Sequence, residues 1–172
     1  MAKTIVITGP ESAGKTTLSN ELSQVLNLPL LPEYAREYLS ELSGDYTLND
    51  VENMAREQLN REREIVLNSN SSCVLDTDLT VYHVWLKEKY QQEWDWINDH
   101  LADNAQKIYL LMAPDLEWEY DPMREHANPS DRQRLFHQYE VLLKSNGANY
   151  HIVKGQGEER LKNAMKIVSI YF

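Results

Sequence analysis

The sequence predicts an α/β fold in which a five-stranded parallel sheet is flanked by helices. Three observations favour it: short apolar runs alternate with segments of helical period, the first run leads into a glycine-rich turn, and the 172-residue chain is 42% hydrophobic. That length supports one hydrophobic core and is short for two. Alternating strands and helices are typical of parallel sheets, so we expect one domain over residues 1–172.

The first half of the chain supplies three strands. Thr4–Thr8 is a continuous apolar run, as expected for a strand buried on both faces, and a helical pattern follows it. Leu28–Pro32 is a shorter strand whose two prolines indicate an edge or an irregular end. Glu33–Leu42 has a helical pattern, and Thr47 can cap a long helix. Ser72–Asp76 is the third strand.

The second half supplies the remaining two strands. An aromatic-rich segment precedes the fourth strand, Lys107–Ala113. Residues from about 115 to 131 have no clean period and carry charges, and we expect them to form a lid. Ser130 begins a capping-box pattern that opens the next helix. His151–Lys154 is the fifth strand and is followed by an amphipathic helix.

The net charge and the composition limit the kinds of molecule that the protein is expected to bind. The net charge is -10, from 27 acidic and 17 basic residues, and no basic run forms a tail. Non-specific binding to nucleic acid or to an anionic membrane is therefore not expected. The single cysteine, Cys73, starts an apolar run and suggests a buried, reduced thiol. With no signal peptide or membrane span in the pattern, we expect a cytoplasmic protein; the sequence does not set its oligomeric state.

The stretch GPESAGKT, Gly9–Thr16, satisfies the pattern G-x-x-x-x-G-K-[ST] and lies between a predicted strand and a predicted helix. In that context backbone amides surround the β-phosphate of a nucleotide, the lysine reaches the β and γ oxygens, and the threonine hydroxyl binds Mg²⁺. A chance glycine turn is the weaker alternative. We expect ATP and Mg²⁺ here, with Lys15 catalytic and Thr16 a metal ligand. The expected ATP contacts in the loop are Gly9, Glu11, Ser12, Ala13, Gly14, Lys15, Thr16 and Thr17.

Asp76 ends the third strand, where a carboxylate can hold a water molecule on the magnesium ion. We expect it to be a metal-site and catalytic residue. The alternative is an ordinary helix cap, since aspartate is common there.

Among the enzymes that carry this glycine-loop motif, the sequence favours one reaction class. The guanine motif N-K-x-D of GTPases is absent, and the chain is short for a motor or helicase, which leaves small-molecule kinases. Their lids bring cations to the transferring phosphoryl group and exclude water. The candidates are Arg124, Arg132 and Arg134: we expect the first two to be catalytic, and Arg132 to contact ATP as well. A solvated helix face is the competing interpretation for each arginine.

Several longer stretches resemble the kinase domain of the bifunctional NadR proteins. They are GPESAGKTTL, PEYAREYL, LDTDLTVYHVW, YLLMAPDLEWEYDPMRE, DRQRL and GQGEERL, and they cover nearly the whole chain. The resemblance implies a P-loop NTPase fold of the nucleoside and nucleotide kinase type. It also implies the ATP-dependent phosphorylation of ribosylnicotinamide to nicotinamide mononucleotide, a step of NAD salvage.

The family pattern adds two expectations. The bifunctional members carry an adenylyltransferase domain ahead of the kinase, whereas this glycine loop starts at residue 9, so the chain resembles the kinase domain standing alone. In the family and its neighbours the loop after the fifth strand passes the adenine base. Here that loop is residues 155–158, with Gly157 as the expected contact, and a simple turn before the last helix is the alternative.

Ribosylnicotinamide carries a pyridinium cation, which favours aromatic faces and carboxylates over cations in its site. Tyr82, Trp85 and Trp118 lie near acidic residues in the sequence and are the expected aromatic contacts. Core packing is the alternative for the first two, because aromatic residues fill interiors as readily as pockets. The neighbouring acidic residues are Asp76, Asp78, Glu117 and Glu119.

The group that takes the proton of the 5′-hydroxyl is expected to be a carboxylate at the carboxyl edge of the sheet. Glu33, just past the second strand, is the first choice, and Asp76 is the rival. Asp78 is expected to bind the ribose diol or orient the acceptor, and Arg36 to contact the acceptor or Glu33 itself. The alternative for Glu33 is that it only stabilises the start of the next helix.

Two other functions remain open on the sequence. A kinase for a deoxynucleoside or a polyol would keep the glycine loop and the lid but change the aromatic residues. A module that binds ATP without turnover would keep the loop alone. The presence of acceptor-side carboxylates argues against the second, because a pure sensor does not need them.

Overall fold

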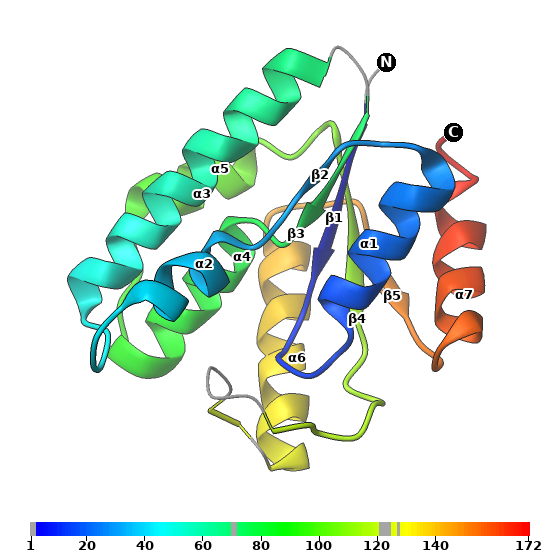
Figure 1. Ribbon diagram of the computed structural model, residues 1–172. Helices are drawn as coiled ribbons and strands as arrows, with labels where there is room; N and C mark the ends of the chain where they lie inside the picture. The colour runs from blue at the N-terminus through cyan, green and yellow to red at the C-terminus, as the bar shows by residue number, and fades with distance from the viewer. Residues whose placement is uncertain (1–2, 70–71, 121–124, 127) are drawn as a thin grey trace.

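The computed structural model describes residues 3–69, 72–120, 125–126 and 128–172, and these contain the predicted five-stranded parallel sheet (Figure 1). The strand order is β2-β3-β1-β4-β5, and every pairing is parallel. The second strand is only two residues long and lies at an edge, as its prolines indicated. The strands are β1 (Thr4–Thr8), β2 (Leu30–Leu31), β3 (Cys73–Asp76), β4 (Lys107–Met112) and β5 (Tyr150–Val153).

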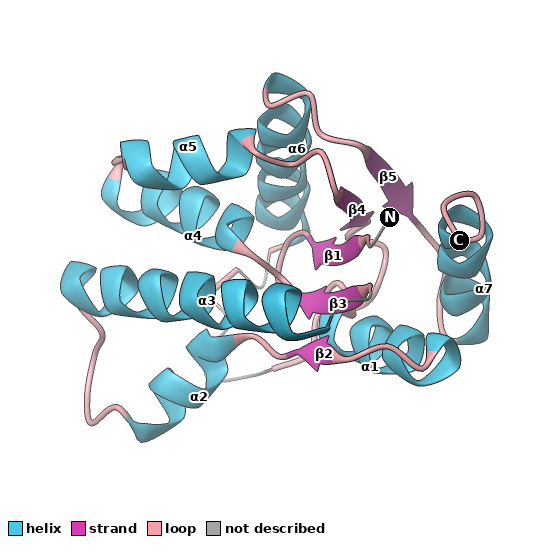
Figure 2. Ribbon diagram, turned by 90° about the horizontal axis from the view of Figure 1, so that it is seen from above, coloured by secondary structure: helices cyan, strands magenta, loops and turns pink. Residues whose placement is uncertain are grey.

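Helices cover both faces of the sheet, and Figure 2 shows α1 and α7 on one side and α3 to α6 on the other. Ile5 and Ile7 pack with Leu18 and Leu22 on the first side, whereas Val6 belongs to the core on the second. This alternation explains why β1 is apolar at successive positions. The helices are α1 (Lys15–Leu26), α2 (Tyr34–Glu41), α3 (Leu48–Ser69), α4 (Leu79–Trp85), the π-helix η1 (Leu86–Tyr90), α5 (Asp95–Ala102), α6 (Pro129–Ser145) and α7 (Glu158–Val168).

N-terminal caps were predicted for two helices, α3 and α6, and the structure shows which residues cap each of them. At the start of α3, the Asp50 amide donates to the Thr47 hydroxyl (3.3 Å) and the Thr47 amide donates to the Asp50 carboxylate (2.7 Å), so the predicted cap is confirmed. The prediction for α6 is wrong, because the helix starts at Pro129 and its cap is Asn128. The Asn128 Oδ1 accepts from the Ser130 amide and hydroxyl, both at 3.0 Å, so Ser130 lies inside the first turn.

Two further expectations concern the interior and the membrane. Cys73 is a free thiol that is 1% exposed, which confirms the expected burial, and that burial raises its pKa. Among the helices of the described residues, none combines the length and the apolar character needed to cross a bilayer.

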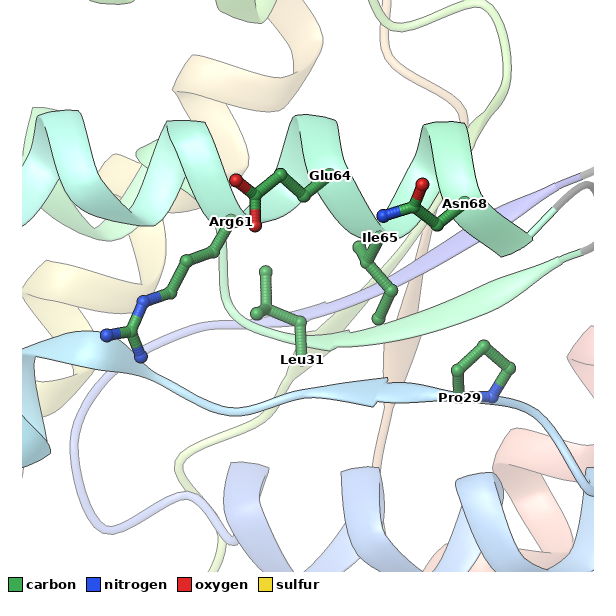
Figure 3. A pocket seen from close by; sticks show the side chains of 6 residues that line it. All are labelled: Pro29, Leu31, Arg61, Glu64, Ile65 and Asn68. Carbon is green, nitrogen blue, oxygen red and sulfur yellow. The ribbon is translucent and has the colours of Figure 1, made fainter.

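The edge strand leaves a groove of about 560 Å³ on its α3 side. Figure 3 shows Leu31 and Ile65 facing each other across it. None of the residues predicted to bind nucleotide or acceptor lines this groove, so we place the candidate site elsewhere. The lining residues are Pro29, Leu31, Arg61, Glu64, Ile65 and Asn68.

Candidate active site

The glycine loop joins β1 to α1 at the carboxyl edge of the sheet. Gly9 has a φ of 132°, and a Cβ at this position would lie 3.0 Å from the carbonyl oxygen of Met112, so only glycine fits. Gly14 has a φ of 75° and caps α1 without a side chain. The loop therefore approaches the neighbouring strand β4 closely and leaves the first amides of α1 without a side-chain cap, as a phosphate site requires.

Lys15 contacts the carbonyl oxygens of the loop and is influenced by the charges of two carboxylates. Its Nζ donates to the carbonyl oxygens of Gly9 (3.0 Å) and Pro10 (2.8 Å). Burial lowers the pKa of the Lys15 ammonium, and the charges of Glu33 and Asp76 oppose that shift. Segments far apart in the sequence thus bring one cation and two anions together.

Asp76 lies at the end of β3, beside the glycine loop. Burial raises the pKa of this carboxyl group, which is 2% exposed, and a hydrogen bond from the Thr16 hydroxyl and the charge of Lys15 oppose the rise. Its Oδ1 has no hydrogen-bond partner among the described residues. A buried carboxylate oxygen without a partner, next to the threonine of the loop, fits a hydrated Mg²⁺ ion.

Glu33 precedes α2 at the carboxyl edge of the sheet. It occupies the cap position, but its side chain makes no capping hydrogen bond, which weakens the interpretation that it only starts the helix. Its side chain is 15% exposed, and Oε2 lies 3.6 Å from Nε of Arg36. The predicted contact between Arg36 and Glu33 is therefore present.

Two of the residues predicted to bind the acceptor, Asp78 and Tyr82, are fully buried. Asp78 has no exposed surface, and its carboxylate accepts hydrogen bonds from Thr80, Lys107 and Tyr109. Tyr82 also has no exposed surface and stacks on Trp85 with ring centroids 6.2 Å apart, so the core-packing alternative applies to it. Neither side chain reaches the surface in this structure, and contact of either residue with a substrate stays a prediction.

Trp85 and Trp118 remain candidates for an aromatic wall. Trp85 is partly buried, donates from Nε1 to the Tyr46 hydroxyl at 3.0 Å, and meets that ring edge-on. Trp118 is also partly buried, and its Nε1 has no partner among the described residues. Tyr46 could not be expected here from the sequence, because it lies in the turn before α3 with no periodic pattern to mark it.

The predicted lid lies against the glycine loop. The Ser12 hydroxyl accepts from the Glu119 amide at 3.1 Å and donates to the Glu117 carbonyl at 3.3 Å. The Glu11 carboxylate accepts from the Glu125 amide at 3.0 Å and from the amide of His126. Glu11 and Ser12, predicted as ATP contacts, therefore also hold the lid segment.

The three candidate arginines have different surroundings. Arg132 is 4% exposed and donates to the carbonyl oxygen of Leu116 at 2.9 Å. The side chain of Leu116 in turn lies against the glycine loop, because a Cβ on Gly14 would be 3.0 Å from its Cδ1. Arg134 pairs with Glu88 at the surface. This agrees with the competing interpretation that this arginine lies on a solvated helix face. Arg124 lies outside the described residues.

Arg160 is a residue of this site that the sequence analysis missed. It is 4% exposed, and its guanidinium donates to the carbonyl oxygen of Ala13 in the glycine loop and contacts the carboxylate of Asp115. Its Nε donates to Gly155 at 2.6 Å, which joins the predicted adenine loop to the glycine loop. An arginine four residues before Ala164, on the apolar face of α7, is the signal that could have found it. Gly157, the expected adenine contact, is exposed just before α7.

The resemblance to NadR is confirmed by comparison with known proteins. The chain is 24% identical over 171 residues to the trifunctional NAD biosynthesis/regulator protein NadR of Salmonella typhimurium, a match that covers 96% of this chain and 42% of that protein. The chain thus spans less than half the length of the curated relatives it matches.

Solved structures of NadR proteins are also similar to this chain. A NadR protein in complex with NR superimposes with a TM-score of 0.80 at 25% identity, over 99% of this chain and 51% of the other. A NadR protein in complex with NAD and AMP-PNP gives 0.79 at 25% identity, over 99% and 49%. Thymidylate kinase from Ehrlichia chaffeensis gives 0.66 at 17% identity, over 99% of each chain, and shares the fold.

The fold is that of the P-loop nucleoside kinases, with the predicted five-stranded parallel sheet and flanking helices. A family model described as an AAA domain matches residues 4–160, which is most of the sequence and includes the glycine loop, β3 and the lid. The chain therefore belongs to this AAA domain family.

Proposed function

We propose that the protein is an ATP-dependent kinase that phosphorylates the 5′-hydroxyl of ribosylnicotinamide to give nicotinamide mononucleotide. The observation that carries the proposal is the glycine loop with the Lys15 ammonium bound to its carbonyl oxygens and influenced by the charges of Glu33 and Asp76. One cation suits the phosphates of ATP, and two carboxylates suit a metal ion and an acceptor hydroxyl. The likeness to NadR structures that hold NR and AMP-PNP supports both the donor and the acceptor.

The different roles that we propose for Asp76 and Glu33 follow from how deeply each carboxylate is buried. One oxygen of Asp76 has no partner in the part of the chain that the structure describes, and the other lies beside Thr16. Asp76 would hold a water of the Mg²⁺ ion, which neutralises phosphate charge when bound. Glu33 is more exposed than Asp76 and lies at the start of α2, so it would accept the proton of the attacking hydroxyl.

The lid and the aromatic wall complete the site. Arg132 would stabilise the transferring phosphoryl group from the lid side, where it already contacts Leu116. Trp85 and Trp118 would meet the pyridinium ring, with Glu33 and Arg36 at the ribose. The aromatic faces of these two tryptophans would suit a cationic ring.

The first test is the release of ADP from Mg·ATP with nicotinamide riboside, thymidine, deoxyadenosine and uridine as acceptors. We expect nicotinamide riboside to be the preferred acceptor. Preferential turnover of another nucleoside would exclude nicotinamide riboside as the main acceptor, while the kinase activity itself would stand. Binding of ATP with no turnover across the panel would favour the sensing module.

The role of Glu33 is tested by Glu33→Gln. We expect kcat to fall by about 10²-fold or more while the acceptor KM changes little, because the base acts in the transition state. Glu37→Gln is the matched control, since Glu37 lies on the same helix but pairs with Arg61 at the surface. A near-normal kcat for Glu33→Gln would move the role to Asp76.

A further inference from the structure

The turn after β3 contains a backbone conformation that threonine rarely adopts. Thr77 has a φ of 72°, in the left-handed region, where a β-branched side chain is strained. Thr77 has no exposed surface, and its amide donates to the carbonyl oxygen of Ile7 at 3.0 Å. Such a conformation persists only where the surroundings enforce it.

The next residue, Asp78, is anchored by four hydrogen bonds in the interior. Its Oδ1 accepts from the amide (2.9 Å) and the hydroxyl (2.7 Å) of Thr80. Its Oδ2 accepts from Nζ of Lys107 (3.0 Å) and from the hydroxyl of Tyr109 (2.9 Å). The carboxylate is therefore fixed from its own helix and from β4.

This anchor reaches both the glycine loop and a distant helix. The hydroxyls of Thr80 and Thr8 lie 2.6 Å apart, and Thr8 is the residue before Gly9. On the other side, Lys107 pairs with Glu62 of α3 at 2.7 Å, with both side chains less than 10% exposed. Because a buried ion pair keeps its two side chains together, the turn is held from β1, β4 and α3.

Asp76 depends on that turn for its direction. Its Oδ1 makes no hydrogen bond with the described residues, so the carboxylate is placed by the hydrogen bond from Thr16, the charges of Lys15 and Arg36 and the course of the backbone. In a strand that continued, Asp76 and Asp78 would share one face; the left-handed Thr77 between them ends the alternation. If Thr77 relaxed to a negative φ, the main chain on both sides would turn and the Asp76 carboxylate would move.

We propose that Asp78 is a positioning residue, which holds Thr77 in its left-handed conformation and thereby fixes the Asp76 carboxylate beside Thr16 and Lys15. The kinetic part of this inference rests on the proposed kinase function. Its structural part does not, because the amide of Thr77 can be observed without turnover.

The direct test is Asp78→Asn, which keeps the shape of the side chain but removes its charge. We expect kcat to fall by about tenfold or more with the acceptor KM within about twofold, because a small misplacement of a catalytic group costs rate. We also expect hydrogen exchange of the Thr77 amide, followed by NMR, to become about tenfold faster as its bond to Ile7 loosens.

Tyr109→Phe is the milder variant, since it removes one hydrogen bond to Asp78 and keeps the ion pair with Lys107. It should change kcat and Thr77 exchange in the same direction by a smaller factor, and it carries the test if Asp78→Asn fails to fold. Unchanged exchange at Thr77 in the variant that folds would overturn the proposal. A raised acceptor KM at unchanged kcat would also overturn it, because Asp78 would then contact the acceptor.

A second substitution separates positioning from general loss of stability. Glycine adopts a φ of 72° without strain, so Thr77→Gly added to Asp78→Asn should recover most of the lost kcat. Asn104→Ala is the control, because it removes buried hydrogen bonds to Leu101 and Asn146, both at 3.0 Å, away from the site. It should lower Tm without changing kcat or Thr77 exchange; equal kinetic effects would reduce Asp78 to a purely structural residue. If the unchanged protein turns over no acceptor, the proposed function fails, and Thr77 exchange still decides the positioning role.

Discussion

The guanidinium of Arg160 donates a hydrogen bond to the carbonyl oxygen of Ala13 inside the glycine loop, although the two residues lie 147 positions apart in the chain. The same side chain reaches Gly155 and Asp115, so α7, the loop after β5 and the loop after β4 are joined to the phosphate site by one residue. Because Arg160 is 4% exposed, its contacts are formed in the interior, where hydrogen bonds to a charged group are strong.

We expect Arg160→Met to raise the KM for ATP by about tenfold, with little change in the acceptor KM, because the glycine loop would lose its support from α7. Initial rates at varied ATP and at varied acceptor concentrations measure the two constants. Arg63→Met is the control, since Arg63 is an exposed arginine on α3. An unchanged KM for ATP would show that the loop holds its shape without Arg160.

Lys15→Ala should lower kcat by about 10²-fold or more, because phosphoryl transfer is stabilised mainly by fixed positive charge. The measurement is ADP release at saturating substrates, with circular dichroism to confirm the fold. Lys162→Ala, at an exposed position on α7, is the comparison and should retain full activity. Comparable rates for both variants would remove Lys15 from the transfer step.

Asp76→Asn should make the protein more stable and less active. Burial raises the pKa of Asp76 in the folded state, so the folded state binds a proton more tightly than the unfolded state does. Stability therefore falls as pH rises from the unfolded pKa through the raised folded pKa, and above both the ionised carboxylate is a net cost. At pH 7 the amide removes that cost, and we expect Tm to rise by roughly 2–4 °C, for a gain of about 1 kcal/mol, while kcat falls.

Thermal unfolding of Asp76→Asn and the unchanged protein at pH 7 and pH 4 provides the check. The difference in Tm should shrink at pH 4, because the carboxyl group is then closer to neutral in both states. A variant that is less stable than the unchanged protein at pH 7 would mean that the contacts with Thr16 and Lys15 outweigh burial.

Asn128→Ala should lower the free energy of unfolding by about 1 kcal/mol, because the start of α6 would lose the side-chain oxygen that accepts from Ser130. Urea denaturation measures the change. Ser130→Ala is the informative comparison, since Ser130 is the cap that the sequence pattern indicates. We expect it to cost less than half as much, and the reverse order would restore the sequence-based cap.

The predictable part of the candidate site is its local part. Gly9, Gly14 and Lys15 follow from a short pattern between a strand and a helix, because a phosphate loop is made by consecutive residues. Glu33 and Asp76 could be placed at the carboxyl edge because each follows a strand of a parallel sheet. The lid stays a prediction from the lack of period in residues 115–131, and the side chains that contact this segment, Glu11 and Ser12, were predicted only as ATP contacts.

The surroundings of three side chains could not be predicted from the sequence: those of Asp78, Tyr82 and Arg160. Asp78 and Tyr82 follow β3 in the same segment as Asp76, but their surroundings come from β4, α2 and α3, which no local pattern relates to them. Arg160 looks like a surface charge at the start of a helix, and only the packing of α7 beside α1 makes it a buried support. Burial of a polar side chain depends on what packs over it, and that information is spread across the whole chain.

The sequence by itself determined the order of strands and helices, the parallel sheet and the position of the phosphate loop, because these depend on periodicity and on residues next to each other. Only the tertiary structure decided which of two aspartates, Asp76 and Asp78, lies beside Lys15 and which is enclosed by Lys107 and Tyr109. The physical reason is the left-handed Thr77 between them: its conformation is enforced by contacts distant in the chain, and it sends neighbouring carboxylates into different surroundings.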